Sequence, residues 1–253
     1  MAAIRKPYQG ITNIIRFNWH YYLIAALLVL ALVIFRFMLH LEYWFYLGLL
    51  LLIIIPTSVS LLVSFFIYDV SGFYKLKWLD PVVSRPAGNI VNINAGFDET
   101  SALLQAKFPE AAVTVFDFYD PAMHTEISIR RARQAYPPHK NSIKVNTATL
   151  PLSDGSINHI FVIFAAHEIR NDGERALFFA ELNRVLLPGG KIIIVEHIRD
   201  ILNFIAYSIG AFHFLPAGCW MTTFNKANLT LARKIKNTPF VTTFILTKNG
   251  DPS

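Results

Sequence analysis

The sequence predicts an α/β domain, built on a doubly wound and mostly parallel sheet, behind a two-helix transmembrane hairpin. Two observations carry this expectation. Two long apolar runs open the chain, and strand-like and helix-like segments alternate through the remainder. Such alternation is typical of parallel sheets whose strands are joined by crossover helices.

Two apolar segments near the start predict the hairpin. The first is Trp19–Met38 and the second spans residues 43–68. Each reaches the length of about 20 residues that carries a helix across roughly 30 Å of hydrocarbon. Only residues 39–42 connect them, so the two helices must run antiparallel.

The distribution of charge predicts the orientation of the hairpin. Basic residues gather on its open side, whereas the turn keeps only Arg36. Because cytoplasmic flanks carry the excess of Lys and Arg, both termini and the α/β domain are expected in the cytoplasm. A cleaved signal peptide is the alternative, but the first run lacks a small-residue cleavage site and a second run follows it. The flanking basic residues are Arg5, Lys6, Arg16, Lys75, Lys77 and Arg85.

The chain therefore divides into four expected parts. They are a cytoplasmic N-terminal segment (1–18), the hairpin (19–68), a juxtamembrane linker (69–88) and the α/β domain (89–253). Within the domain, strands are expected at 89–94, 112–116, 142–145, 159–164, 191–196 and 240–247, with helices at 100–108 and 174–187 between them.

Composition narrows the choice of partners. A net charge of +6 beside apolar spans favours contact with anionic lipid headgroups, and no basic run interleaved with aromatics predicts nucleic-acid binding. The single Cys219 excludes an internal disulfide and cysteine-rich metal sites. His124, His139 and His159 lack metal-ligand spacing, so no metal is expected. Alanine and glycine residues in the spans leave helix pairing in a homo-oligomer open.

The segment NIVNINAGFDETS, residues 89–101, places a small-residue turn between a strand and a helix. The next strand ends in Asp117, about 20 residues beyond Gly96. An acidic side chain at that spacing is placed to accept hydrogen bonds from ribose hydroxyls. The order of strand, turn, helix, strand and acid therefore indicates a nucleoside-like ligand beyond the carboxyl ends of the strands.

Five blocks that follow one another in the chain resemble one enzyme family. They are YDVSGFY, VFDFYDPAM, VNTATLPLSDGSINHIFVIFAAHEI, AELNRVLLPGGKIIIVEH and, more loosely, AGCWMTTF. Over residues 68–248 the chain is similar to class I methyltransferases that depend on S-adenosyl-L-methionine (SAM). It resembles ubiquinone/menaquinone-type C-methyltransferases and membrane-anchored methyltransferase-like thiol methyltransferases.

This resemblance implies a Rossmann-like fold of the class I methyltransferase type, with SAM as cofactor. It also implies methyl transfer to a lipophilic small-molecule or lipid acceptor at the cytoplasmic membrane face. A non-catalytic membrane scaffold that keeps a degenerate methyltransferase fold is the alternative. A nicotinamide oxidoreductase is excluded by the LPGG turn and by the missing glycine fingerprint.

The departures from the family fall at the cofactor, where residues 92–98 read NINAGFD instead of an acid followed by Gly-x-Gly-x-Gly. We expect modified contacts here. Asn94 is predicted to adopt a left-handed φ in place of a glycine, Asn92 to receive a hydrogen bond from the ligand's ammonium, and Asp98 to replace the acid. The alternative is a site that has decayed beyond binding.

The resemblance extends to other parts of the cofactor site. Asp117 takes the ribose position, Asn146 and Thr147 lie near the adenine, and Tyr74 covers the cofactor or else anchors the chain at the interface. Phe118 stacks on adenine or is simply core. The predicted cofactor contacts are Tyr74, Asn92, Asn94, Ala95, Gly96, Asp98, Asp117, Phe118, Asn146, Thr147 and Phe164.

Methyl transfer needs alignment, exclusion of water and, for some acceptors, removal of a proton. The candidate bases are His167 and Glu168, directly after the fourth strand, and His197 at the end of the fifth. The alternative for either histidine is a neutral side chain bonded to backbone at a strand end. Residues 201–216 are strongly apolar, as in the packed helix of a soluble enzyme or the lid of a lipophilic acceptor pocket at the bilayer.

Overall fold

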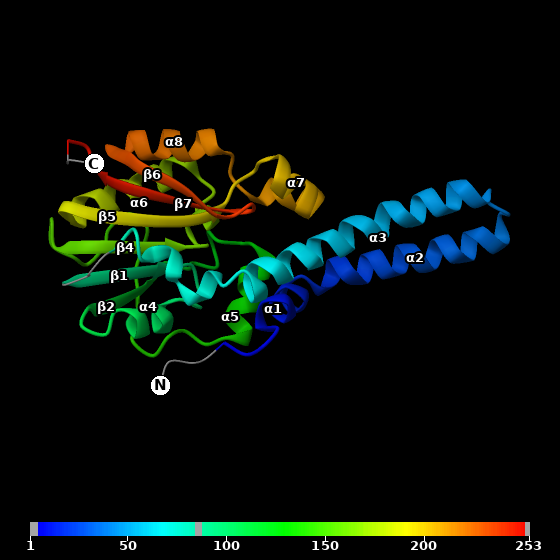
Figure 1. Cartoon of the computed structure of the whole chain (residues 1–253), viewed down its shortest axis with the longest axis horizontal. Coiled ribbons are helices and arrows are strands. Elements are labelled where there is room, and N and C mark those ends of the chain that lie inside the picture. The colour runs from blue at the N-terminus through cyan, green and yellow to red at the C-terminus, as the bar shows by residue number, and fades with distance from the viewer. Residues whose placement is uncertain (1–4, 84–87, 251–253) are drawn as a thin grey trace.

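A seven-stranded sheet forms the centre of the domain, with the strand order β3-β2-β1-β4-β5-β7-β6 (Figure 1). The computed structural model describes residues 5–83 and 88–250, so Arg85 and part of the predicted linker lie outside the described residues. Strands β1 to β5 are parallel, and β7 runs antiparallel to both of its neighbours. The predicted doubly wound, mostly parallel sheet is confirmed. The strands are β1 (Asn89–Asn94), β2 (Ala112–Asp117), β3 (Ser142–Lys144), β4 (Ile157–Ile163), β5 (Leu186–His197), β6 (Leu229–Thr238) and β7 (Val241–Lys248).

Helices cover both faces of the sheet, and the hairpin projects from one end of the domain (Figure 1). The α-helices are α1 (Gln9–Phe17), α2 (Trp19–Met38), α3 (Tyr43–Phe65), α4 (Ser101–Lys107), α5 (Ile127–Ala135), α6 (Asp172–Val185), α7 (Ile201–Tyr207) and α8 (Ala217–Lys226). Shorter helical turns are η1 (Phe66–Val70), η2 (Phe73–Lys75), η3 (Lys77–Leu79), η4 (Ala166–Glu168) and η5 (Ser208–His213).

Two apolar clusters hold these layers together, one on each face of the sheet. Side chains on a strand alternate between faces, so Val91 and Ile93 join one cluster while Ile90 joins the other. The first cluster lies under α6 and α8 and includes Phe178 and Trp220. Because both faces are covered, the central strands are almost continuously apolar.

The second cluster is built partly from residues that the sequence assigns to the linker. Leu76 and Leu79 are almost fully or fully buried against the sheet, and so is Ile67, which the sequence assigns to the end of the hairpin. The described part of the predicted linker, residues 69–83, is therefore packed on the domain and is not a separate connection. Their apolar side chains complete one face of the domain instead.

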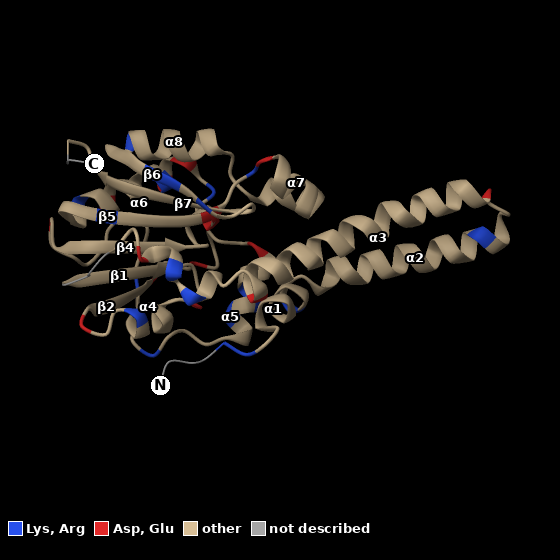
Figure 2. Cartoon of the chain, in the orientation of Figure 1, with Lys and Arg blue, Asp and Glu red and all other residues tan. Residues whose placement is uncertain are grey.

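The hairpin helices α2 and α3 pack against each other, and both are long and apolar enough to cross a membrane. This assignment as candidate membrane spans rests on the length and composition of the helices alone. The buried share of the most apolar 18-residue window is 0% in α2 and 11% in the helix that includes α3, so neither is the core helix of a soluble domain. Apart from its tip, the hairpin carries almost no charge, whereas acidic and basic residues populate the domain (Figure 2).

Helix α1 lies across the base of the hairpin and contacts α3 and α5. The carboxylate of Asp69 accepts hydrogen bonds from the first backbone amides of α1, Gly10 N at 2.9 Å and Ile11 N at 2.8 Å. Gly10 is required there, because a Cβ atom would stand 2.3 Å from the Cβ of Tyr68. The N-terminal segment is thus locked onto the edge of the domain.

Candidate functional site

The carboxyl ends of the parallel strands β1, β2, β4 and β5 meet at one edge of the sheet, which is where such sheets bind ligands. Most of the predicted site residues lie on this edge or in the loops that follow it. Helix α1 covers part of the edge, since Phe17 meets Phe97 edge to face with ring centroids 5.4 Å apart. The edge therefore has a covered part and an uncovered part.

The turn after β1 is ordered by the amide of Asn94. Its Nδ2 donates to Phe116 O at 3.0 Å, and its Oδ1 accepts from Gly96 N at 3.0 Å. Asn94 is not among the positive-φ residues of the described chain, so the left-handed conformation predicted for it is wrong. Gly96 adopts that conformation, with a φ of 93°, and a Cβ there would lie 2.9 Å from Tyr119. The neighbouring Ala95 is buried.

Asn92 and Asp98 support the start of α4. Asp98 Oδ1 accepts from the backbone amides of Thr100 and Ser101, at 3.0 and 2.9 Å, and Asn92 Nδ2 donates to both hydroxyls. The Oδ1 atom of Asn92 is buried and has no hydrogen-bond partner within the described part of the chain. An orphaned buried acceptor of this kind fits a donor from a ligand, such as an ammonium.

Asp117 ends β2 with its carboxylate almost fully buried. One oxygen accepts from Tyr119 N at 2.9 Å, and the other pairs with the guanidinium of Arg133 on α5. Arg133 also reaches Gly96 O at 3.4 Å. The acid predicted to bind ribose is therefore in place at the strand end, and an arginine holds the oxygen that a ribose hydroxyl would use.

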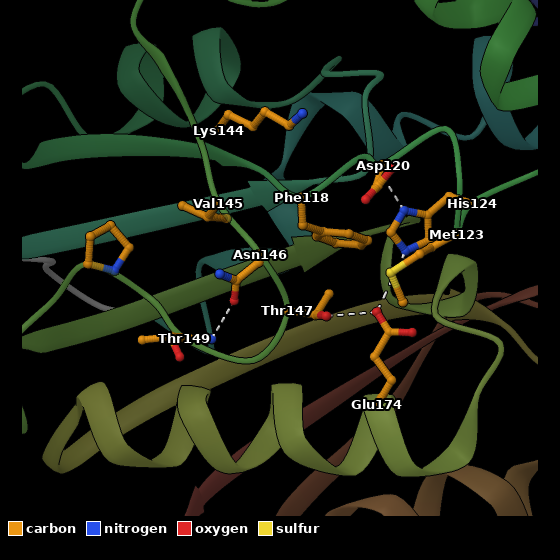
Figure 3. A pocket seen from close by; sticks show the side chains of 11 residues that line it. Phe118, Asp120, Met123, His124, Lys144, Val145, Asn146, Thr147, Thr149 and Glu174 are labelled. Atoms are coloured by element: carbon orange, nitrogen blue, oxygen red, sulfur yellow. Dashed lines mark hydrogen bonds and ion pairs between the residues drawn. The ribbon is translucent and has the colours of Figure 1, made fainter.

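An uncovered pocket of about 410 Å³ lies beyond β2 and β3 (Figure 3). This volume falls in the range of small-molecule sites, roughly 300–1,000 Å³. Three residues predicted to lie near the adenine, Phe118, Asn146 and Thr147, line it. Phe118 belongs to the core, which is its alternative role, and stacking on adenine stays a prediction.

Polar side chains around the pocket hold one another in place (Figure 3). Thr147 Oγ1 donates to a carboxylate oxygen of Glu174 at 2.7 Å, and Asn146 Oδ1 accepts from the amides of Ala148 and Thr149. His124 meets Phe118 edge to face at 5.2 Å, and its buried Nε2 lies 3.9 Å from Glu174 Oε1 without a hydrogen-bond partner in the described residues. The sequence did not predict His124 or Glu174 here, because no motif joins them to the strands.

Glu99 ties the N-terminal segment to the loop after β1. Tyr74 Oη donates to Glu99 Oε2 at 2.7 Å, and Arg5 Nη1 lies 2.5 Å from Oε1. The guanidinium of Arg5 also lies 3.6 Å above the Tyr74 ring. Burial raises the pKa of Glu99, although Arg5 and Tyr74 act in the opposite direction. Tyr74 thus covers the strand ends through Glu99, a residue that the sequence alone did not single out.

A charged cluster lies beyond β4 and β5. His167 Nδ1 lies 2.6 Å from Glu196 Oε2, and His167 Nε2 lies 3.3 Å from Glu168 Oε1. Burial lowers the pKa of His167, but the carboxylates of Glu196 and Glu168 raise it to about 10. Burial raises the pKa of Glu168, but the hydrogen bond from His167 and its charge lower it to about 2. The predicted pair is therefore an ion pair, organised by a glutamate that the prediction missed.

The same cluster has the donor atoms of a metal site. Single ligand atoms of His167, Glu168 and His213 lie within 4.8 Å of one another. However, the Arg170 guanidinium contacts both ring nitrogens of His213. A cationic side chain in this position opposes a second cation, so we do not assign a metal here.

His197 takes the alternative role, that of a neutral histidine at a strand end. Its Nε2 accepts from the hydroxyl of Tyr68 at 2.8 Å, and its Nδ1 donates to Phe240 O at 3.0 Å. Burial and the nearby charge of His167 lower its pKa to about 4. Phe164, which has a φ of 51°, stacks on its ring at 5.1 Å. With both nitrogens bonded and its pKa lowered, His197 stays neutral at pH 7, as its alternative role requires, and its part as a base stays a prediction.

Comparison with known proteins agrees with this geometry. Residues 92–194 match a family model described as a methyltransferase domain. The chain is 24% identical over 164 residues to a demethylmenaquinone methyltransferase from Thermus thermophilus, covering 56% of this chain and 72% of that protein. It is 30% identical over 141 residues to a ubiquinone/menaquinone biosynthesis C-methyltransferase from Methylobacterium nodulans, covering 51% of this chain and 54% of that one.

A SAM-dependent methyltransferase of known structure from Aquifex aeolicus superposes with a TM-score of 0.50 at 17% identity. The match covers 76% of this chain and 97% of that chain, and it concerns the fold. Residues 92–194 form a methyltransferase domain, and the fold of the chain is that of SAM-dependent methyltransferases. The predicted resemblance to these enzymes is thereby confirmed.

The chain matches only part of the length of these curated relatives. The chain spans 54% and 59% of two curated quinone methyltransferases, and the apolar hairpin lies before the matched residues 92–194. Asp117 ends β2, where the motif predicts a ribose ligand, and residues predicted to lie near the adenine line the pocket. The domain differs from the family's glycine-rich turn, in which only Gly96 remains.

Proposed function

We propose that this protein is a membrane-anchored methyltransferase that transfers the methyl group of SAM to a lipophilic acceptor at the cytoplasmic membrane face. The observation that carries the proposal is the pocket of about 410 Å³ beyond β2 and β3. Its lining includes Phe118, Asn146 and Thr147, the residues at the adenine positions of the family motifs.

The residues present fit SAM, provided that the covered part of the edge opens. Asn92 offers an unpaired buried oxygen for the ammonium of the methionine moiety. Asp117 offers a carboxylate to the ribose once Arg133 releases it. Ala95 and Gly96 leave the turn after β1 without large side chains, so the backbone can approach the ligand. When bound, SAM supplies a methyl group on an electrophilic sulfonium.

The charged cluster suits an acceptor that reacts as an anion. His167 is held between Glu196 and Glu168 and stays protonated at neutral pH, since its pKa is about 10. A protonated imidazole donates a hydrogen bond to an anion such as a phenolate or a thiolate. Both N–H groups of His167 already face Glu196 and Glu168, so His167 contacts the acceptor's anionic atom where that atom displaces Glu168 from Nε2, and it is not a free base.

The lipophilic acceptor is inferred from the hairpin and from the relatives. Two relatives are named for menaquinone or ubiquinone methylation, which favours a quinol-like ring. The exposed apolar hairpin supports membrane insertion, with Arg5, Arg16, Lys75 and Lys77 on its domain side and hence both termini in the cytoplasm. Tethering raises the local concentration of an acceptor that partitions into the bilayer. Homo-oligomerisation stays a prediction.

Methyl transfer from isotopically labelled SAM tests the proposal. The full chain in lipid nanodiscs is incubated with a lipophilic quinol, a lipophilic thiol and a lipid amine, and mass spectrometry detects the labelled product. We expect product from the quinol or the thiol, and at least about 100-fold less from Glu196→Gln, which removes one of the two carboxylates beside His167. Binding of SAM without transfer to any acceptor class would contradict the catalytic part. No binding by the folded protein would favour the scaffold.

A further inference from the structure

The segment α7–η5, residues 201–213, presents an apolar surface that no part of the described chain covers. Its exposed large side chains have exposed fractions between 46% and 78%. No Asp, Glu, Lys or Arg occurs from 201 to 213. The exposed residues are Ile201, Leu202, Phe204, Ile205, Ile209 and Phe212.

In this segment a polar side chain is buried and the apolar side chains are exposed, which is the reverse of a surface helix in a soluble protein. Asn203 is fully buried, and its amide donates to Ile198 O at 2.9 Å and to Phe240 O at 3.1 Å. The outward face is apolar instead. In a soluble enzyme the apolar face packs on the core, so the alternative of a packed helix is contradicted.

The segment is held firmly at both ends. Asp200 accepts from Asn203 N at 3.0 Å and so caps α7. Arg199 donates to Phe214 O at 2.8 Å and to Phe212 O at 2.6 Å, which fixes the return of η5. The outward apolar face is therefore a fixed feature of the fold.

The position of α7 identifies what covers it. Helix α7 packs on α3, at the end of the hairpin nearest the domain (Figure 1). With 23 residues, α3 is about 34 Å long, slightly more than the roughly 30 Å of bilayer hydrocarbon. The end of α3 that contacts α7 thus stands at the boundary between hydrocarbon and headgroups, which is the level of an interfacial helix.

We propose that α7–η5 inserts its apolar face into the cytoplasmic leaflet beside the hairpin and forms a third membrane contact. The inference rests on the proposed insertion of the hairpin. Apolar faces of interfacial helices enter the headgroup and acyl boundary by about 5–10 Å. Lipid is favoured over a protein partner because the surface is continuous with the exposed apolar hairpin and carries no charged group.

This contact connects the bilayer to the charged cluster. Segment η5 ends at His213, whose ring lies 5.0 Å from that of His167, and Arg170 donates to His213 O at 2.5 Å. An acceptor whose apolar tail stays in the leaflet meets the cluster where η5 leaves the membrane. The substrate class is therefore an amphiphile with a long apolar tail and an acidic head, delivered laterally from the leaflet.

Depth-dependent quenching tests the contact. Cys219→Ala removes the only cysteine of the chain, and single changes Ile205→Cys, Ile209→Cys, Leu27→Cys and Leu177→Cys then receive a fluorophore in the full chain. Leu27 reports on α2, and Leu177 on α6 is the matched control, with an exposed fraction of 60%. Vesicles of phosphatidylcholine and phosphatidylglycerol carry a nitroxide on the acyl chain.

We expect at least threefold quenching at positions 205, 209 and 27 and almost none at 177. Quenching at 27 with positions 205 and 209 unquenched would overturn this inference and leave the hairpin anchor standing. Absence of quenching at 27 would overturn both. The double change Ile205→Asp, Ile209→Asp should lower transfer to a bilayer-resident acceptor about tenfold with SAM affinity unchanged, whereas Leu177→Asp should leave both unchanged.

Discussion

The two halves of the candidate cofactor site differ in what occupies them. The adenine half is an uncovered pocket in which Thr147 and Glu174 bond to each other and leave space between the loops. The ribose and methionine half is covered, because Arg133 pairs with Asp117 and α1 lies over the turn after β1. The same family motifs specify both halves, so the difference lies in partners from distant parts of the chain.

This contrast indicates an order of events. A ligand can enter the adenine half without displacing any side chain, but the ribose must exchange with Arg133 and the methionine moiety requires movement near Glu99. Residues of the N-terminal segment and of η2 hold Glu99. If SAM binds here as we propose, the segment that precedes the hairpin is coupled to its binding through Glu99.

Asp117→Ala is expected to have the largest effect. It removes the carboxylate that we propose for the ribose hydroxyls, and charged hydrogen bonds contribute about 1.5–3 kcal/mol each. SAM affinity should fall at least about 100-fold by calorimetry. Asp80→Ala, which removes an exposed acid paired with Lys107, is the control and should leave affinity unchanged. Equal affinity in wild type and Asp117→Ala would show that the ribose half is not used.

Acid should destabilise the fold through His197, which ends β5. The pKa of His197 is lowered to about 4 from 6.5, so the folded state binds its proton less well than the unfolded state. Stability is therefore fully present above about pH 6.5 and is lost as the pH falls towards 4, with a contribution of about 3 kcal/mol. Protonation also removes the acceptor for the Tyr68 hydroxyl. Urea unfolding between pH 7 and 4 measures this loss, and His197→Gln should flatten it.

Arg133→Gln should open the ribose half. In the wild type the ion pair between Arg133 and Asp117 must break before the ribose binds. Without the guanidinium this cost disappears, so SAM affinity should rise about tenfold. The melting temperature of the free protein should fall, because a nearly buried carboxylate loses its partner. A fall in affinity would mean that Arg133 contacts the cofactor directly.

Tyr74→Phe should have the smallest effect. It removes one hydrogen bond to Glu99 and keeps the ring over which Arg5 lies. Stopped-flow association of SAM should accelerate about threefold if Glu99 helps to close the methionine half. Tyr136→Phe, which removes a hydroxyl bonded to Asn13, is a matched change beside α1. If the association rate of SAM is the same in Tyr74→Phe as in the wild type, Glu99 does not help to close the methionine half.

The parallel sheet could be predicted because its strands are buried on both faces and read as apolar runs. Strand β6 was missed, since it is an edge strand with Arg233, Lys234 and Lys236 along it, and exposed edges commonly carry charge. The burial of residues 67–83 was also missed, because aromatics and lysines in sequence do not distinguish an interfacial stretch from one packed on a sheet.

The site was predictable where a residue's role follows from its place on a strand. Asp117, Phe118 and Asn146 lie where the motifs place them. Arg133 pairs with Asp117, 16 residues away in the sequence, and Glu196 pairs with His167, 29 residues away. The ion pair between Arg5 and Glu99 joins residues 94 positions apart. Such pairs depend on tertiary packing, which no local pattern encodes.

Calorimetric titration of the full chain in nanodiscs with SAM tests the central claim most directly. The account predicts saturable binding of one SAM per chain, weakened at least about 100-fold by Asp117→Ala and strengthened by Arg133→Gln. No detectable binding by wild-type protein that is folded by circular dichroism would contradict it.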